Sequence, residues 1–235
     1  MAEREQGIVA EARITLNDVE KHRWTDERLF KLLDDAQQEV CRNVPLIAKK
    51  VTINTSIGTD EYRLPTDCLK VLTARSGGLS ISTISMEELD HNNPGWEDTV
   101  GSQYTHLVVN NLSQQTIRPY PLMATGYTGM NLDIKIRYSA KPINLGFEID
   151  DSMEELAISD TWDYGLTQYI ISKAFIDYGD ESSLSRAQIA DSLYNGIIGK
   201  ARQDSRKSFS KRVVTTGYQG RVARGEYYGS GNCRY

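Results

Sequence analysis

Residues 24–45 read WTDERLFKLLDDAQQEVCRNVP, and this stretch decides how the chain begins to fold. Thr25 is a good N-cap, and the acidic Asp26 and Glu27 follow it in the first turn, where the helix dipole favours negative charge. Apolar residues then recur at the spacing of one helical face: Leu29, Leu32, Leu33, Ala36 and Val40. Pro45 ends the pattern. The stretch therefore predicts an amphipathic helix over residues 26–42.

Further helices are expected on both sides of this one. Residues 3–20 carry apolar side chains at helical spacing, and so does the segment that begins at Ser159 or Asp160 and stops at Gly179. A last helix is expected from Ser182 or Ser183 to about residue 200. The last two helices are joined by a short loop, so they should form an antiparallel hairpin. Trp24 and Trp162 are expected in the core.

The middle of the chain has the residue pattern of β-strands. Residues 130–138, MNLDIKIRY, alternate apolar and polar side chains, which is typical of a half-buried antiparallel strand. Other strands are expected at residues 50–54, 61–64, 69–75, 104–109 and 115–119, with a short helix at 85–89. The sequence therefore predicts a small antiparallel β-sandwich or barrel-like sheet.

These elements together predict an α+β fold. Its N-terminal and C-terminal helices form a bundle, the antiparallel β-sandwich or barrel-like domain is inserted between them, and an extended C-terminal arm follows. The expected divisions are N-terminal helices at 1–46, the β domain at 47–145, a helical hairpin at 146–200 that packs on the first segment, and the arm at 201–235.

Charge is unevenly distributed along the chain. Residues 200–235 hold nine basic and two acidic residues, a net charge of +7, whereas the rest holds 18 basic and 30 acidic residues, a net charge of −12. The arm also contains glycines and tyrosines in place of a core-forming pattern. Three interpretations follow: a disordered solubilising tail, an arm that binds nucleic acid, or an arm that folds onto a neighbouring subunit or partner.

Catalytic and metal-binding motifs are missing from the sequence. It has no Walker A loop, no dinucleotide-binding glycine pattern, no HExxH and no nucleophile elbow. Its three cysteines form no C-x-x-C pair, which favours a reducing compartment over disulfides or zinc. The acidic residues between 148 and 155 are expected to be a solvated loop. We therefore expect a protein that is not an enzyme and needs no cofactor or metal.

No membrane insertion or secretion is expected either. No apolar run approaches the ~20 residues that span a bilayer. The first residues, MAEREQGIVAEAR, lack the apolar stretch of a signal peptide.

Several strings resemble one family. RWTDE at 23–27, with DAQQEV at 35–40, is similar to a stretch shared by the head-to-tail adaptor proteins of short-tailed bacteriophages. YRLPTDCL at 62–69 is similar to a strand and turn of that group, and PYP at 119–121 with IRYSAKP at 136–142 is similar to one of its hairpins. The resemblance covers about residues 8–198 as an order of elements.

The resemblance implies a structural virion protein. Such adaptors form a ring, usually of twelve copies, beneath the portal protein. They extend the channel for double-stranded DNA, without sequence-specific binding, and dock the tail nozzle or tail tube. The protein would then act in the neck of the virion, after assembly in the host cytoplasm. The alternative is a nucleic-acid-binding accessory protein that uses the basic arm.

A protomer of such a ring needs two different adhesive faces. The exposed side of the 26–42 helix and the arm rich in tyrosine and arginine are the candidates for contacts with another subunit or the portal. The candidate residues are Asp34, Gln38, Arg42, Arg206, Lys207, Lys211, Arg212, Tyr218, Arg221, Arg224, Tyr227, Tyr228 and Tyr235. An acidic body suits a channel wall, because it repels phosphates and lets DNA slide.

Overall fold

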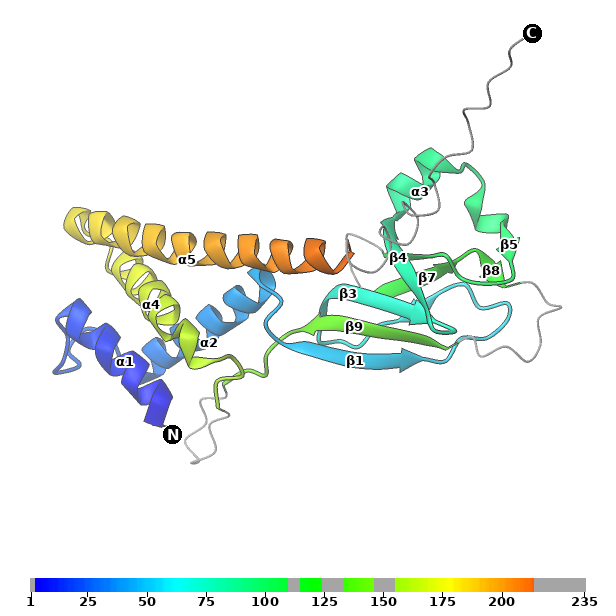
Figure 1. Cartoon of the computed structure of the whole chain (residues 1–235). Coiled ribbons are helices and arrows are strands. Elements are labelled where there is room, and N and C mark those ends of the chain that lie inside the picture. The colour runs from blue at the N-terminus through cyan, green and yellow to red at the C-terminus, as the bar shows by residue number, and fades with distance from the viewer. Residues whose placement is uncertain (1–2, 110–114, 124–132, 146–154, 214–235) are drawn as a thin grey trace, which may run out of the picture.

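The computed structural model describes residues 3–109, 115–123, 133–145 and 155–213, with side chains as far as Ser205. It contains a helical bundle and a separate β domain (Figure 1). The bundle consists of α1 (Glu3–Leu16), α2 (Asp26–Asn43), α4 (Asp163–Tyr178) and α5 (Glu181–Val213). The predicted α+β class, with a barrel-like domain inserted into a helical bundle, is confirmed.

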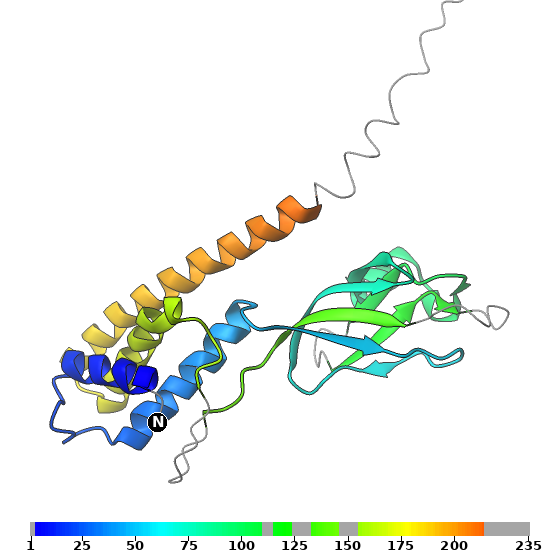
Figure 2. The same ribbon diagram turned by 60° about the horizontal axis from the view of Figure 1, so that its bottom comes forward.

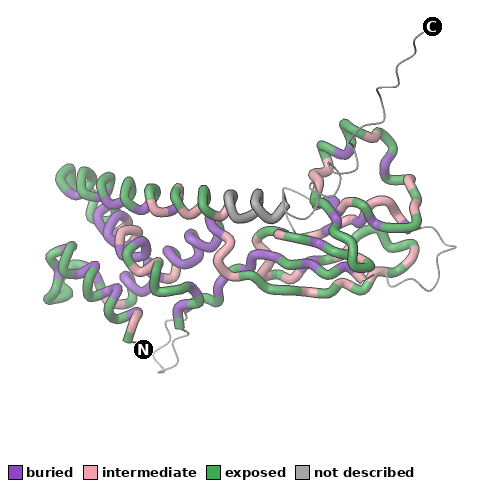
Figure 3. The backbone as a smooth tube through the Cα atoms, viewed as in Figure 1, coloured by how far each residue is buried: buried purple, intermediate pink, exposed green. Residues whose placement is uncertain are grey.

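The bundle is built around α4, which packs against α1, α2 and α5. Apolar residues of all four helices are buried together, and the purple segments of Figure 3 mark this interior. Leu29, Leu33 and Val40 of α2 are fully buried, so the apolar stripe read from the sequence is the face that packs. Trp24 is a core residue as expected, whereas Trp162 is only partly buried at the edge of the same core.

The β domain is a seven-stranded, barrel-like sheet. Its strands follow the order β1-β9-β3-β4-β6-β7-β2. Their bounds are β1 Ala48–Ile53, β2 Tyr62–Arg63, β3 Cys68–Ser76, β4 Leu79–Ser85, β6 His106–Val109, β7 Thr116–Tyr120 and β9 Ile134–Ala140. A small pair, β5 (Val100–Gly101) and β8 (Leu122–Met123), lies beside them, together with the short helices α3 (Met86–Asn92) and η1 (Trp96–Asp98).

Strand β9 confirms the alternation read from the sequence. Ile134, Ile136 and Tyr138 are buried, while Lys135 and Arg137 are exposed. The strand pairs with β1 on one side and β3 on the other, so it is central in this half of the sheet. The remaining residues of the predicted 130–138 strand lie outside the described part except for Asp133.

The sheet is mixed, not purely antiparallel as predicted. Strand β4 pairs with β6 in parallel, while the other pairs of the large sheet are antiparallel. A parallel pair needs a long crossover, and α3 and η1 supply it between these two strands. No strand was predicted at 79–85, because four of its seven residues are serine or threonine and the apolar alternation is weak.

The last helix is longer than predicted. It continues to Val213, so residues 201–213 are helical and not part of an extended arm. No glycine or proline occurs between residues 200 and 216, so nothing in the sequence breaks the helix there. Figure 2 shows the end of α5 projecting beyond the bundle. The rest of the expected arm, 214–235, lies outside the described residues.

Candidate assembly surfaces

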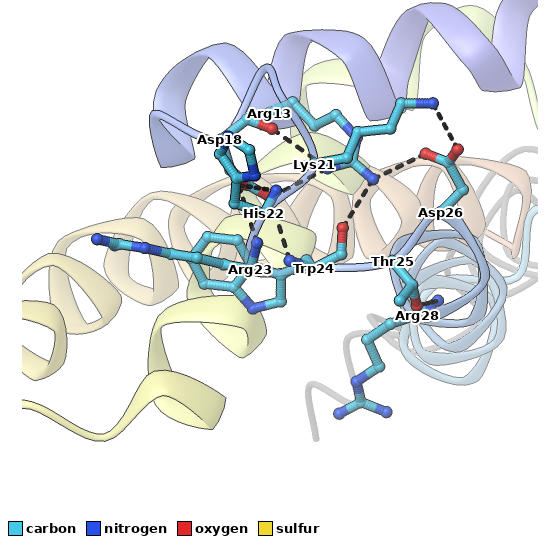
Figure 4. Close-up of polar contacts among 9 residues, drawn as sticks. All are labelled: Arg13, Asp18, Lys21, His22, Arg23, Trp24, Thr25, Asp26 and Arg28. Carbon is cyan, nitrogen blue, oxygen red and sulfur yellow. Dashed lines mark hydrogen bonds and ion pairs between the residues drawn. The ribbon is translucent and has the colours of Figure 1, made fainter.

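The connection between α1 and α2 is organised by one buried carboxylate, Asp18 (Figure 4). It accepts hydrogen bonds from the backbone N–H groups of His22, Arg23 and Trp24, at 2.8, 3.0 and 3.1 Å. Burial alone would raise the pKa of Asp18. The three N–H donors and the nearby charge of Arg13 outweigh it, and the pKa lies below its ordinary value. The carboxylate therefore stays charged and holds the loop in one shape.

Arg13 joins this loop to the start of α2. Its Nη1 lies 3.1 Å from the Asp18 carboxylate, and its Nη2 donates to Asp26 at 2.7 Å and to the carbonyl of Trp24 at 3.0 Å. Lys21 donates to the other oxygen of Asp26 at 2.6 Å. The hydrogen bonds from Lys21 and from Arg13 lower the pKa of Asp26. This end of the bundle is therefore a network of ion pairs between two helices.

Aromatic contacts fix the same loop onto α4. The Trp24 ring lies 6.1 Å from the ring of Tyr178, and the guanidinium of Arg23 lies 4.7 Å from the same tyrosine ring. Arg28 also donates to Asp177 through Nε at 2.9 Å. Sequence reasoning missed this network, although Arg23, Trp24 and Asp26 belong to the RWTDE string that carries the family resemblance. The available signal was Trp24 with a charged residue on each side in sequence, Arg23 directly before it and Asp26 two residues after it.

The polar side of α2 holds the chain that returns from the β domain. Gln38 is buried, and its amide donates to the carbonyl of Pro142 at 3.3 Å and to Asn144 Oδ1 at 2.9 Å. Asp34 accepts from the backbone N–H of Leu145 at 3.0 Å. Gln38 is thus not on an exposed face, because an irregular segment needs partners for its backbone and finds them on α2.

Two further side chains bind the segment that leads into α4. Gln37, fully buried, donates to the carbonyl of Ile143 at 3.2 Å and accepts from the N–H of Ala157 at 2.8 Å. Glu5 of α1 is also buried and accepts from the N–H of Leu156 at 2.8 Å. Helices α1 and α2 therefore fix both ends of the stretch that connects the β domain to the C-terminal helices.

A cleft of about 560 Å³ lies where α2, β3 and α5 meet. Arg42, an interface candidate from the sequence, lines it together with Lys70 and Arg202, so its rim is basic. Arg42 is exposed and pairs with Glu39 at 3.3 Å. Cys41 also lines the cleft, but burial raises the pKa of its thiol to about 11, which keeps it in the unreactive neutral form.

The ten candidates from the expected arm divide into two groups. The four residues Arg206, Lys207, Lys211 and Arg212 belong to the last turns of α5. The other six lie outside the described residues: Tyr218, Arg221, Arg224, Tyr227, Tyr228 and Tyr235. Helix α5 has no buried residue after Ile198 as far as its side chains are described. Contacts with the bundle continue just beyond it, because Ala201 packs against the bundle core and Arg202 donates to Asn43 Oδ1.

The described residues hold no group of three or more histidine, cysteine, aspartate or glutamate side chains that could bind a metal ion. Among the same residues, no helix combines the length and the apolar character of a membrane span.

Comparison with known proteins gives one result. The family model described as SU10 adaptor protein matches residues 6–217, which include the bundle, the β domain and all of α5. No curated protein matches the sequence.

Proposed function

Since this chain belongs to the SU10 adaptor protein family, a family of phage structural proteins, we propose that it is a head-to-tail adaptor that forms a ring beneath the portal. In this role it extends the DNA channel and docks the tail nozzle or tail tube, as in short-tailed phages. The ring has about twelve copies, the number usual in the adaptors that the sequence resembles. It occupies the neck of the virion and assembles in the host cytoplasm.

The observation that carries the proposal is the match over residues 6–217, because it includes both structural units and the projecting helix. The architecture supports it. A bundle with its own core can form the body of a ring, and the β domain, held by two connections, can reach another layer of the neck. The end of α5, which projects beyond the bundle, offers a surface to a portal or to a neighbouring subunit.

Charge supports the conduit role. The chain outside residues 200–235 has a net charge of −12, which repels DNA phosphates and lowers binding to a channel wall. Residues 200–235 carry a net charge of +7, with which they can contact an acidic protein surface.

The proposal is tested with the purified protein and the portal ring of the same phage. We expect electron micrographs of the mixture to show an additional ring on the portal, and the mass of the complex to rise by a fixed number of copies. A protein that stays monomeric and leaves the portal unchanged would contradict the proposal. Deletion of residues 201–235 should weaken attachment without unfolding the body.

A second candidate function is binding of nucleic acid through the basic C-terminal region. It is favoured by the nine basic residues in 200–235. Such binding falls steeply with salt, because each phosphate contact releases a counterion. Salt-dependent retention of double-stranded DNA that disappears on deletion of 201–235 would support it. Equal mobility of DNA with and without the protein at low salt would exclude it.

A further inference from the structure

Two helices of the bundle expose matching stripes on their outer faces. The outer stripe of α1 consists of Glu3, Gly7, Ala10 and Ile14, and all four residues are exposed. The outer stripe of α5 consists of Ile189, Leu193, Gly196 and Lys200, which are also exposed. Ile14 is 69% exposed and Ile189 is 63% exposed, although residues of this type are usually buried. Each stripe is therefore an apolar helix face without a partner in the described chain.

The spacing of the two stripes is the same when one is read backwards. Along each stripe the successive residues are four, three and four positions apart. The distances along the helix axis between neighbouring stripe residues are therefore the same in both helices. In antiparallel alignment Glu3 faces Lys200, Gly7 faces Gly196, Ala10 faces Leu193 and Ile14 faces Ile189. The pairs are an acid with a base, two glycines, a small with a large apolar residue, and two isoleucines.

The glycines allow the two helices to approach closely. A Cβ added at Gly7 or Gly196 meets no atom within 4 Å, so neither glycine is needed for packing inside the chain. A glycine inside a helix costs about 0.5–1 kcal/mol relative to alanine. A partner helix that packs closely against both glycines would account for their presence at these positions.

The charges of the two stripes are opposite. On α1 the exposed charges near the stripe are Glu3 and Glu11, while Arg4 is paired with Asp163 and Arg13 is buried. On α5 the charges in and beside the stripe are the basic Arg186 and Lys200 and the acidic Asp204, so the net charge there is positive. The α1 face is therefore acidic and the α5 face basic, which favours contact between them over contact of either face with itself.

The position of the helices excludes contact within one chain. Helix α4 packs against both α1 and α5 and lies between them (Figures 1 and 2), so the exposed stripes of α1 and α5 do not meet within one chain. In Figure 1 α1 runs from lower right to upper left and α5 runs from left to right, so the two helices have broadly opposite senses and are inclined to each other. Neighbours in a ring of many copies are related by a small rotation, which keeps this antiparallel sense when α1 of one copy meets α5 of the next.

We propose that the outer stripe of α1 in one copy packs antiparallel against the outer stripe of α5 in the next copy, and that this contact closes the ring. The inference rests on the proposed function and specifies its subunit interface. The contact is heterologous, since it uses two different faces, so it links copies head to tail and not as a symmetric dimer, and the chain of copies becomes a ring when the rotation between neighbours closes.

Cysteine cross-linking tests the pairing directly. The exposed Ala10 and Leu193 are replaced by cysteine in a chain whose Cys68 and Cys233 are changed to serine, while the buried Cys41 remains. When the variant with both A10C and L193C is assembled on the portal and oxidised, we expect a ladder of disulfide-linked multimers on a denaturing gel. The variants with A10C alone or L193C alone should stay monomeric. Dimers from either single variant would show a symmetric contact and overturn the inference.

A matched substitution supplies a second measurement. Leu193→Asp places a charge in the α5 stripe, and Leu184→Asp places the same charge on the opposite side of the same helix. The two leucines are 44% and 43% exposed, so neither change should unfold the bundle, which circular dichroism checks. We expect L193D to reduce ring formation at least tenfold and L184D to leave it within twofold.

The outcomes separate the two levels of the proposal. Rings on the portal without a cross-linked ladder, together with normal assembly of L193D, would overturn this interface but leave the adaptor function intact. No multimer with or without the portal would overturn both the proposed function and the interface.

Discussion

Replacing Asp18 with asparagine should destabilise the helical bundle. The substitution keeps the size of the side chain but removes the charge that accepts three backbone N–H groups and faces Arg13. The Asp18 side chain is 2% exposed and that of Arg13 is 6% exposed, so water cannot replace the lost contacts.

The magnitude follows from the contacts that are lost. Removal of one partner of a buried ion pair costs roughly 3–5 kcal/mol. Arg13 keeps Asp26 and the carbonyl of Trp24, and the new amide oxygen still accepts some of the N–H groups, so the loss should be at the low end. We expect D18N to lower the free energy of unfolding by about 2–3 kcal/mol at pH 7, and D18A by about 4 kcal/mol.

Urea unfolding followed by circular dichroism at 222 nm measures this difference. Asp35→Asn on the exposed side of α2 is the matched control, with an expected change below about 0.5 kcal/mol. The folded-state pKa of Asp18 is depressed, so its contribution is present above the ordinary pKa of about 4 and is lost as pH falls through the folded value. When the pH is lowered from 7 to below 4, the free energy of unfolding should therefore fall less for D18N than for the wild type. An equal stability of D18N and wild type at pH 7 would refute the reasoning.

Three other predictions follow from burial. Trp24→Ala should cost about 3–5 kcal/mol, and Trp162→Ala should cost less because this ring is only partly buried; thermal unfolding of both variants measures the difference. Deletion of residues 201–235 should change the melting temperature by only a few degrees, because Ile198 is the last buried residue of α5 as described, and a collapse of that temperature would show that the deleted part belongs to the core. Cys41 should resist iodoacetamide at pH 8 in the folded protein, since burial raises its pKa to about 11, and mass spectrometry after labelling would detect any reaction.

Periodicity predicted the regular elements well. The apolar stripe of residues 29–40 and the alternation of Ile134, Ile136 and Tyr138 each had one buried face, and in both cases the structure buries that face. The bundle with an inserted β domain followed from the order of these patterns. Strand β4 was missed because its serines carry no strong period, and its parallel pairing depends on a crossover that local patterns do not encode.

The interface candidates were harder to predict. Asp34 and Gln38 are polar and lie beside the apolar stripe, so the sequence placed them at the surface. The structure shows them hydrogen-bonded to a segment more than 100 residues away. Periodicity describes which face of a helix is polar, but it cannot tell whether water or a remote backbone satisfies that face. The exposed apolar stripes of α1 and α5 became visible only when the inner faces of both helices were known.

The two connections to the β domain have an evolutionary consequence. The chain leaves the bundle after α2 and returns at residues 141–145, beside the same helix, where Asp34, Gln37 and Gln38 fasten it. The bundle and the β domain each have a core of their own. Both connections of the β domain thus lie beside α2, and a phage lineage could exchange this domain for one that fits a different tail while the bundle keeps its own geometry.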